Sequence, residues 1–143
     1  LERARQFGAI ALNPLSDNVA TAVREICSDR GGVDVAFEMS GNEAVYPEIF
    51  SYIRREGTLV SVGHPGKPVP IDVAAYINKQ GVAFRGVFGR RIWDTWEILS
   101  ALVGTKRLDL TSLVTHRTPL TDYLEAFTAV KESGIKGIFH LHG

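Results

Sequence analysis

VDVAFEMSG, at residues 33–41, is a mostly apolar run that ends in a glycine, which is the pattern of a buried strand leading into a turn. Two later stretches repeat the pattern, TLVSVGHP at 58–65 and VAFRGVFG at 82–89, and helical patterns lie between the three. Ligands of α/β proteins bind just beyond the carboxyl ends of parallel strands. Three such strand ends in order therefore predict a crevice that holds a nucleotide cofactor.

The alternation of strands and helices predicts an α/β fold, the second half of a Rossmann-like, doubly wound parallel sheet with helices on both faces. We expect strands at 9–13, 33–39, 58–62 and 82–88, and helices at 19–27, 43–55, 71–80 and 92–103. A strand, a helix and a strand follow at 113–116, 122–132 and 137–142. The first half of such a sheet is missing, since no Gly-x-Gly-x-x-Gly occurs and the chain opens inside a helical pattern.

Composition argues against several classes of partner. The 143 residues carry 16 basic and 16 acidic side chains, so the formal net charge is zero and no basic stripe favours nucleic acid or an anionic membrane. The single cysteine, Cys27, allows no internal disulfide and suits a reduced compartment. No apolar run approaches the roughly 20 residues of a membrane span, and the N-terminus lacks a signal-peptide pattern. We expect a cytoplasmic protein.

The string GVFGRRIWDTW at 86–96 is the most distinctive in the chain. Arg90 and Arg91 lie where a strand gives way to a helix, so they could bind a phosphate at the helix N-terminus or could be solvated or interface arginines. Trp93 and Trp96, one helical turn apart, are expected to pack in a core or an interface rather than to stack on a ligand.

The histidines are weaker signals. His64, between Gly63 and a proline, could touch a cofactor at the crevice or simply lie in a loop. His140 and His142 share one face of a strand, but no third ligand accompanies them, which argues against a metal site. His116 and the arginine after it receive no role from their spacing.

Two carboxylates, Asp34 and Glu38, lie on one face of the strand at 33–39. Asp34 is expected near solvent at the start of the strand, so the two are not expected to form an acid–base pair.

Four strings resemble the zinc-dependent medium-chain dehydrogenases, and within them the branch of L-threonine 3-dehydrogenases. They are EMSG at 38–41, GTLVSVGHPG at 57–66, PIDVAAYINKQGVAFRGVFGRRIWDTW at 70–96 and VTHRTPLTDYLEAF at 114–127. The resemblance covers essentially the whole chain but only the C-terminal portion of such an enzyme. It implies a partial NAD(P)-binding Rossmann domain at 1–112 and, at 113–143, a C-terminal segment that returns to the catalytic domain.

The resemblance implies an NAD-dependent zinc oxidoreductase that oxidises the secondary hydroxyl of L-threonine to 2-amino-3-ketobutyrate by hydride transfer. Relatives take their zinc ligands and proton relay from an N-terminal domain outside these residues, so no catalytic or metal residue is assigned and the isolated chain is expected to be inactive. Two alternatives stay open: a non-catalytic oligomerisation or regulatory module, and a portion of a polyol or 2,3-butanediol dehydrogenase. The choice of NAD over NADP also stays open.

The cofactor residues that the resemblance implies lie at two strand ends. Val62, Gly63 and His64 match the family's backbone contacts to the nicotinamide and its ribose, although relatives carry an aliphatic residue in place of His64. Val87 and Phe88 match the next strand end, which bonds the carboxamide.

Two further implications concern the second half of the chain and its partners. Lys136 matches a basic position that reaches the cofactor pyrophosphate in some relatives. The strand at 82–88 lies at the sheet edge in relatives and pairs with the same strand of a second subunit, so we expect a homo-oligomer. The expected small-molecule partner is L-threonine or a similar secondary alcohol.

Overall fold

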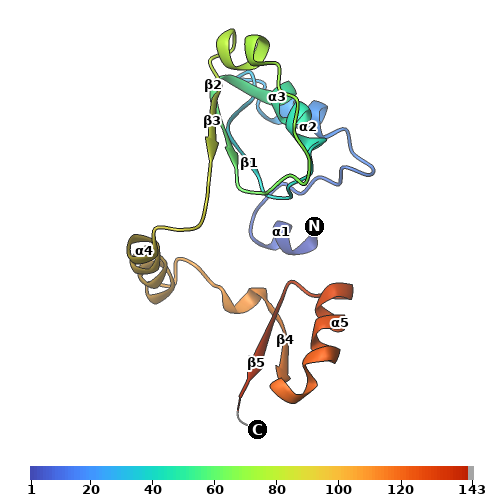
Figure 1. Ribbon diagram of the computed structural model, residues 1–143, viewed down its shortest axis with the longest axis vertical. Coiled ribbons are helices and arrows are strands. Elements are labelled where there is room, and N and C mark those ends of the chain that lie inside the picture. The colour runs from blue at the N-terminus through green and yellow to red at the C-terminus, as the bar shows by residue number, and fades with distance from the viewer. Residues whose placement is uncertain (142–143) are drawn as a thin grey trace. The chain divides into compact units, whose positions relative to one another are not determined.

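The computed structural model describes residues 1–141, and its first sheet contains the three strands that the sequence predicts next to glycines (Figure 1). These strands are β1 (Val33–Glu38), β2 (Ile53–Ser61) and β3 (Ala83–Gly86). They run parallel in the order β1-β2-β3. Glu38 is in register with Ser61, and Ser61 with Gly86, so all three strands end at one edge of the sheet. The predicted α/β class and parallel sheet are confirmed.

The helices of this part of the chain are short, and their bounds differ in detail from the predicted ones. They are α1 (Glu2–Gln6), α2 (Val19–Ile26), α3 (Val45–Tyr52) and a π-helical turn at Val73–Asn78. Asn18 caps α2, because its Oδ1 accepts the Thr21 N–H at 3.0 Å. The helix predicted to reach residue 55 ends at Tyr52, since Ile53 is already extended and buried in the sheet.

The core lies between α3 and one face of the sheet. Its buried apolar residues are Ala36, Tyr46, Ile49, Phe50, Ile53, Leu59 and Val82. Each large side chain buried there contributes roughly 1.5–3 kcal/mol to folding. The opposite face of β1 is open within this unit, where Val35 is 46% and Phe37 63% exposed. Within the described residues of this unit, α3 therefore covers one face of β1 and leaves these two side chains exposed on the other.

The predicted strand at 9–13 does not form. These residues carry no strand hydrogen bonds, and none of the described strands pairs with them. A strand needs a neighbour to satisfy its backbone N–H and C=O groups. The apolar pattern alone does not supply one.

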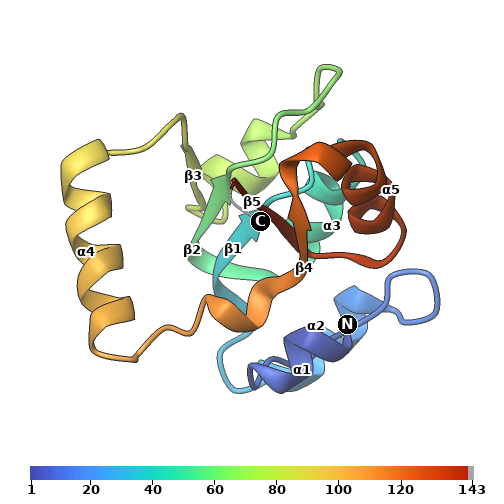
Figure 2. The same ribbon diagram turned by 90° about the horizontal axis from the view of Figure 1, so that it is seen from below.

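A second compact unit begins at Arg90, after the first unit, Leu1–Gly89. It contains α4 (Ile92–Gly104), β4 (Val114–Pro119), α5 (Tyr123–Ser133) and β5 (Lys136–His140), with 3-10 turns at Thr111–Leu113 and Leu120–Asp122. β4 and β5 are parallel, and α5 packs on both, as Figure 2 also shows. The predicted strand–helix–strand segment is thus confirmed; His142 lies outside the described residues. The assignment of residues 1–112 to a partial Rossmann domain and of residues 113–143 to a segment of the catalytic domain stays a prediction.

Helix α4 buries none of its residues. Trp93 is 78% and Trp96 52% exposed, so the expectation that they pack in a core is wrong within the described chain, and their packing in an interface stays a prediction. Leu124 and Phe127 of α5 are also exposed, at 69% and 65%. None of the helices in residues 1–141 has the length and apolarity needed to cross a membrane.

Candidate functional site

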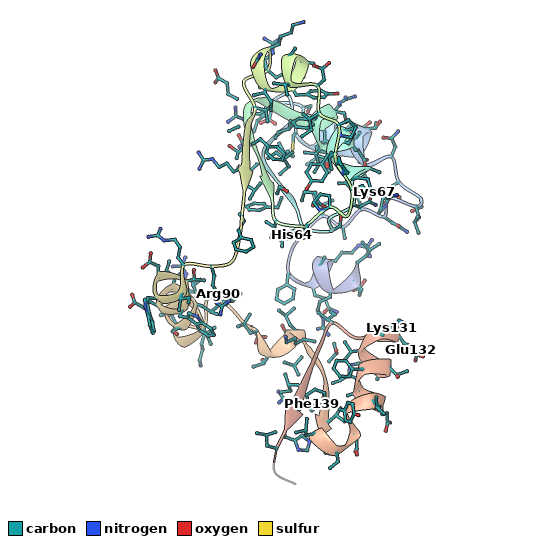
Figure 3. The ribbon with its side chains drawn as sticks, viewed as in Figure 1. His64, Lys67, Arg90, Lys131, Glu132 and Phe139 are labelled. Carbon is teal, nitrogen blue, oxygen red and sulfur yellow. The ribbon has the colours of Figure 1, made fainter. Side chains whose placement is uncertain are left out.

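The strand ends of β2 and β3 enclose a pocket of about 480 Å³, which we call the exit pocket. It is lined by Ser61, Gly63, His64, Pro65, Gly86, Val87 and Phe88. Four of the six residues predicted to bind a cofactor line it, and Val62 lies next to them in the chain. The volume is in the range of small-molecule sites. Figure 3 labels His64 at this end of the sheet.

The walls of the exit pocket combine bare backbone with two rings. Gly86 presents no side chain, and a Cβ built there would meet nothing within 4 Å. The Phe88 ring is 92% exposed and meets the His64 ring edge-on, with 6.4 Å between the ring centroids. The pocket therefore offers a flat aromatic surface and open main chain to a ligand.

Several backbone groups around the pocket are already used to hold the strand ends together. The N–H groups of Val62 and Gly63 both donate to the Glu38 carbonyl, at 2.8 and 3.0 Å, and the Val87 N–H donates to the Ser61 carbonyl at 2.9 Å. Within residues 1–141, the carbonyls of Val62 and Val87 and the N–H of Phe88 have no hydrogen-bond partner. Two acceptors and one donor are thus available, a set that complements a carboxamide.

Glycine is required where the β1 and β2 ends touch. A Cβ on Gly63 would lie 2.2 Å from the Gly41 nitrogen and 2.6 Å from Oε2 of Glu38. Gly41 itself has φ +71°, which L side chains rarely adopt, and its Cβ would lie 2.7 Å from the His64 carbonyl oxygen. The two backbones approach each other more closely than any side chain would permit.

Glu38 is a buried carboxylate behind the exit pocket, with only 2% of its surface exposed. Oε1 accepts the Ser40 N–H at 2.8 Å and the Ser40 hydroxyl at 2.5 Å, and the Gly41 N–H lies 3.0 and 3.1 Å from the two carboxylate oxygens. The Tyr46 hydroxyl donates to Oε2 at 3.3 Å. Burial raises the pKa of Glu38, but the hydrogen bonds from Ser40, Gly41 and Tyr46 outweigh it and hold the pKa below its usual value.

Tyr46 is a functional candidate that the sequence did not single out, and Glu38 was considered there only as a possible acid–base partner of Asp34. The only sequence pattern that indicates this site is the position of Glu38, two residues before Ser40 and three before Gly41. This spacing lets the Glu38 carboxylate accept both N–H groups. Asp34 is engaged separately, with Arg54 Nε at 2.7 Å and Arg30 at 3.0 Å. Asp34 and Glu38 thus have different partners, and the absence of an acid–base pair stays a prediction.

Lys136 belongs to the second unit. It is the first residue of β5 in the second unit, where it lines a separate pocket of about 270 Å³ with residues that include Phe127 and Phe139. Its predicted contact with a pyrophosphate stays a prediction. Arg91, the residue before α4, pairs with Asp94 in the first turn of that helix, and the phosphate role of Arg90 and Arg91 stays a prediction.

His116 has a structural partner. Its Nδ1 lies 2.9 Å from the Thr115 hydroxyl, which accepts the Ile135 N–H at 3.0 Å and donates to the Lys136 carbonyl at 3.2 Å. The pair therefore connects β4 to the start of β5.

Metal ligands do not gather in the described residues. Across residues 1–141 no group of three or more His, Cys, Asp or Glu side chains could hold a metal ion. The residues present therefore do not fit a zinc site, and no chemical step is assigned to zinc here.

Comparisons with known proteins agree with the fold. The family described as zinc-binding dehydrogenase matches residues 1–105. The L-threonine 3-dehydrogenase of Symbiobacterium thermophilum is 34% identical over 140 residues, 96% of this chain and 39% of the relative. That of Caldanaerobacter subterraneus subsp. tengcongensis is 32% identical over 124 residues, 85% of this chain and 35% of the relative. The chain thus spans between a third and two fifths of these curated relatives.

Solved structures give the same result. The 2R,3R-butanediol dehydrogenase from Bacillus subtilis has a TM-score of 0.88 and is 26% identical, covering 99% of this chain and 40% of its own. An alcohol dehydrogenase zinc-binding domain protein from Burkholderia ambifaria has a TM-score of 0.86 and is 30% identical, covering 100% of this chain and 39% of its own.

Proposed function

The chain belongs to the zinc-binding dehydrogenase family, and we propose that it forms the nicotinamide side of an NAD-dependent dehydrogenase. The proposed reaction is oxidation of the secondary hydroxyl of L-threonine to 2-amino-3-ketobutyrate. The observation that carries the proposal is the exit pocket, which brings Gly63, His64, Val87 and Phe88 to one edge of the sheet. This edge is where α/β folds hold nucleotide cofactors.

The exit pocket suits the nicotinamide end of the cofactor. A carboxamide has one carbonyl and one NH₂ group, which match the Phe88 N–H and the carbonyls of Val62 and Val87. The exposed Phe88 ring would flank the flat nicotinamide. When bound, NAD accepts the hydride from the alcohol carbon while the hydroxyl loses its proton. The residues of this chain bind and orient the cofactor.

The substrate proposal rests on the L-threonine 3-dehydrogenases among the relatives. A second substrate class, a vicinal diol, is favoured by the likeness to a butanediol dehydrogenase. The test is to express the complete gene product that carries these residues and to measure NADH formation from L-threonine, 2,3-butanediol and sorbitol, each with NAD and with NADP. A clear preference for L-threonine supports the proposal; a preference for a diol replaces the substrate and keeps the reaction class.

We propose that zinc, where present, is held by residues outside this chain. The described residues supply no ligand cluster. Metal analysis of the complete gene product, with chelation and zinc re-addition, tests this. Zinc bound stoichiometrically by residues 1–143 alone would contradict it.

We also propose that the protein is a homo-oligomer built on β3. The strand lies at the edge of its sheet, and Phe84 on it is exposed. An open strand edge offers its unpaired N–H and C=O groups to a second copy of the same strand across a two-fold axis. Light scattering on the complete gene product tests this, and a monomeric mass at micromolar concentration would refute it.

A further inference from the structure

The three strand ends are connected behind the exit pocket by one chain of hydrogen bonds. It runs from the Glu38 carboxylate at the end of β1, through the Tyr46 hydroxyl of α3, to the Ser61 hydroxyl at the end of β2. The Ser61 carbonyl then holds the Val87 N–H just past β3, at 2.9 Å. These four residues connect the ends of β1, β2 and β3.

Tyr46 is the centre of this connection. Its side chain is buried, with 1% of the residue exposed, and its hydroxyl lies 3.3 Å from Oε2 of Glu38 and 2.7 Å from Oγ of Ser61. An ionised carboxylate can only accept, so the Tyr46 O–H donates to Glu38 and the Ser61 hydroxyl donates to Tyr46. The order of donors is therefore fixed by the charge on Glu38.

The Glu38 carboxylate is ionised because the hydrogen-bond donors around it stabilise its negative charge. Three donors from Ser40 and Gly41 converge on it in addition to Tyr46. Hydrogen bonds to a charged acceptor are shorter and stronger than those between neutral groups. The carbonyl of the same Glu38 also receives the N–H groups of Val62 and Gly63. One residue thus fixes the β1 end with its side chain and the β2 end with its main chain.

We propose that Tyr46 and Glu38 are positioning residues for the nicotinamide. They fix the spacing between the strand ends, and this spacing places the carbonyls of Val62 and Val87 and the Phe88 N–H where they meet a carboxamide. The inference rests on the proposed cofactor site. Neither side chain lines the exit pocket, so neither touches the cofactor. Their effect passes through the backbone of Val87 and Phe88, which line it, and of Val62, which is next to Gly63 in the chain. Small displacements of such groups weaken binding strongly.

The test removes one hydroxyl group, that of Tyr46, from the complete gene product. Tyr46→Phe removes the O–H and keeps the ring, which packs in the core. We expect NADH to bind roughly five- to tenfold more weakly, the cost of one hydrogen bond in a buried network. We also expect the fluorescence of the bound nicotinamide, measured at saturation, to shift toward that of free NADH.

Tyr52→Phe is the matched control. Tyr52 lies on the same helix and is half-buried, but its hydroxyl makes no hydrogen bond within the described residues. This variant should bind NADH as the wild type does. A role confined to stability would instead lower the unfolding temperature of Tyr46→Phe and leave the fluorescence of the saturated complex unchanged.

Ser61→Ala provides a second, independent variant if Tyr46→Phe does not fold. It breaks the same connection from the other side, and because Ser61 also lines the exit pocket, NADH affinity should fall at least as much as in Tyr46→Phe. The double variant should add little to either single variant, because both act on one network. If both single variants bind NADH with the affinity and the fluorescence of the wild type, the inference is overturned and the proposed function stands. Absence of NADH binding by the wild type overturns both.

Discussion

The close approach of two backbones behind the exit pocket makes Gly63→Ala the most informative single substitution. The added Cβ would lie 2.2 Å from the Gly41 nitrogen and 2.8 Å from its Cα. Both neighbours are backbone atoms, so no side chain can rotate away, and relief requires the β1 and β2 ends to separate by about 1 Å. That movement also breaks the bond from the Gly63 N–H to the Glu38 carbonyl, 3.0 Å long in the structure.

Two losses should follow from Gly63→Ala. Overpacking of this kind costs roughly 1–3 kcal/mol of stability. A displacement of about 1 Å at the pocket wall can cost on the order of 100-fold in activity, and we expect a large fall in NADH affinity for the same reason. The assay is NADH fluorescence titration and chemical denaturation of the complete gene product.

Gly66→Ala is the control for this prediction. Gly66 lies three residues further along the same loop, and a Cβ there would meet nothing within 4 Å. The Gly66→Ala variant should have the NADH affinity and the free energy of unfolding of the wild type. If Gly63→Ala is as stable and binds NADH as tightly as Gly66→Ala, the reasoning from backbone packing is refuted.

Three further predictions concern the pocket, the surface charges and the isolated chain. Phe88→Ala should weaken NADH binding while changing the free energy of unfolding by less than about 0.5 kcal/mol, because the ring is 92% exposed; titration and denaturation check this, and unchanged affinity would exclude the ring from the site. Hydrogen bonds from Arg54, and to a smaller extent from Arg30, hold the pKa of Asp34 below its usual value. The carboxylate therefore stabilises the fold at pH values above the unfolded pKa of about 3.9. This stabilisation is lost as the pH falls through the lower pKa of the folded state. Asp34→Asn should therefore lower the unfolding temperature at neutral pH and have progressively less effect in acid, and a difference that does not depend on pH would contradict this. Residues 1–143 alone should form no NADH from L-threonine and NAD, and measurable turnover would disprove that expectation.

The main features of the first sheet could be predicted from sequence because they depend on local patterns. Apolar runs closed by Gly41, Gly63 and Gly89 mark strand ends, and parallel pairing places such ends at one edge. The pocket residues at those ends followed from the same pattern and from the family resemblance. The segment at 9–13 failed for a physical reason, since a strand is defined by its neighbour and none of the described strands provides one.

The network behind the pocket could not be predicted in the same way. Tyr46 is eight residues from Glu38 and fifteen from Ser61, and no periodicity connects the three. Their contact arises only when α3 packs on the sheet. Trp93 and Trp96 do not pack in a core of the described chain, because an apolar stripe shows that a helix can be covered but not what covers it; their packing in an interface stays a prediction.

The central claim is that the nicotinamide of NAD binds at the ends of β2 and β3. A crystal structure of the complete gene product grown with NAD tests it most directly. The account predicts the nicotinamide in the exit pocket, with its carboxamide bonded to the Phe88 N–H and to the carbonyls of Val62 and Val87. A nicotinamide bound elsewhere, with the exit pocket filled only by solvent, would contradict it.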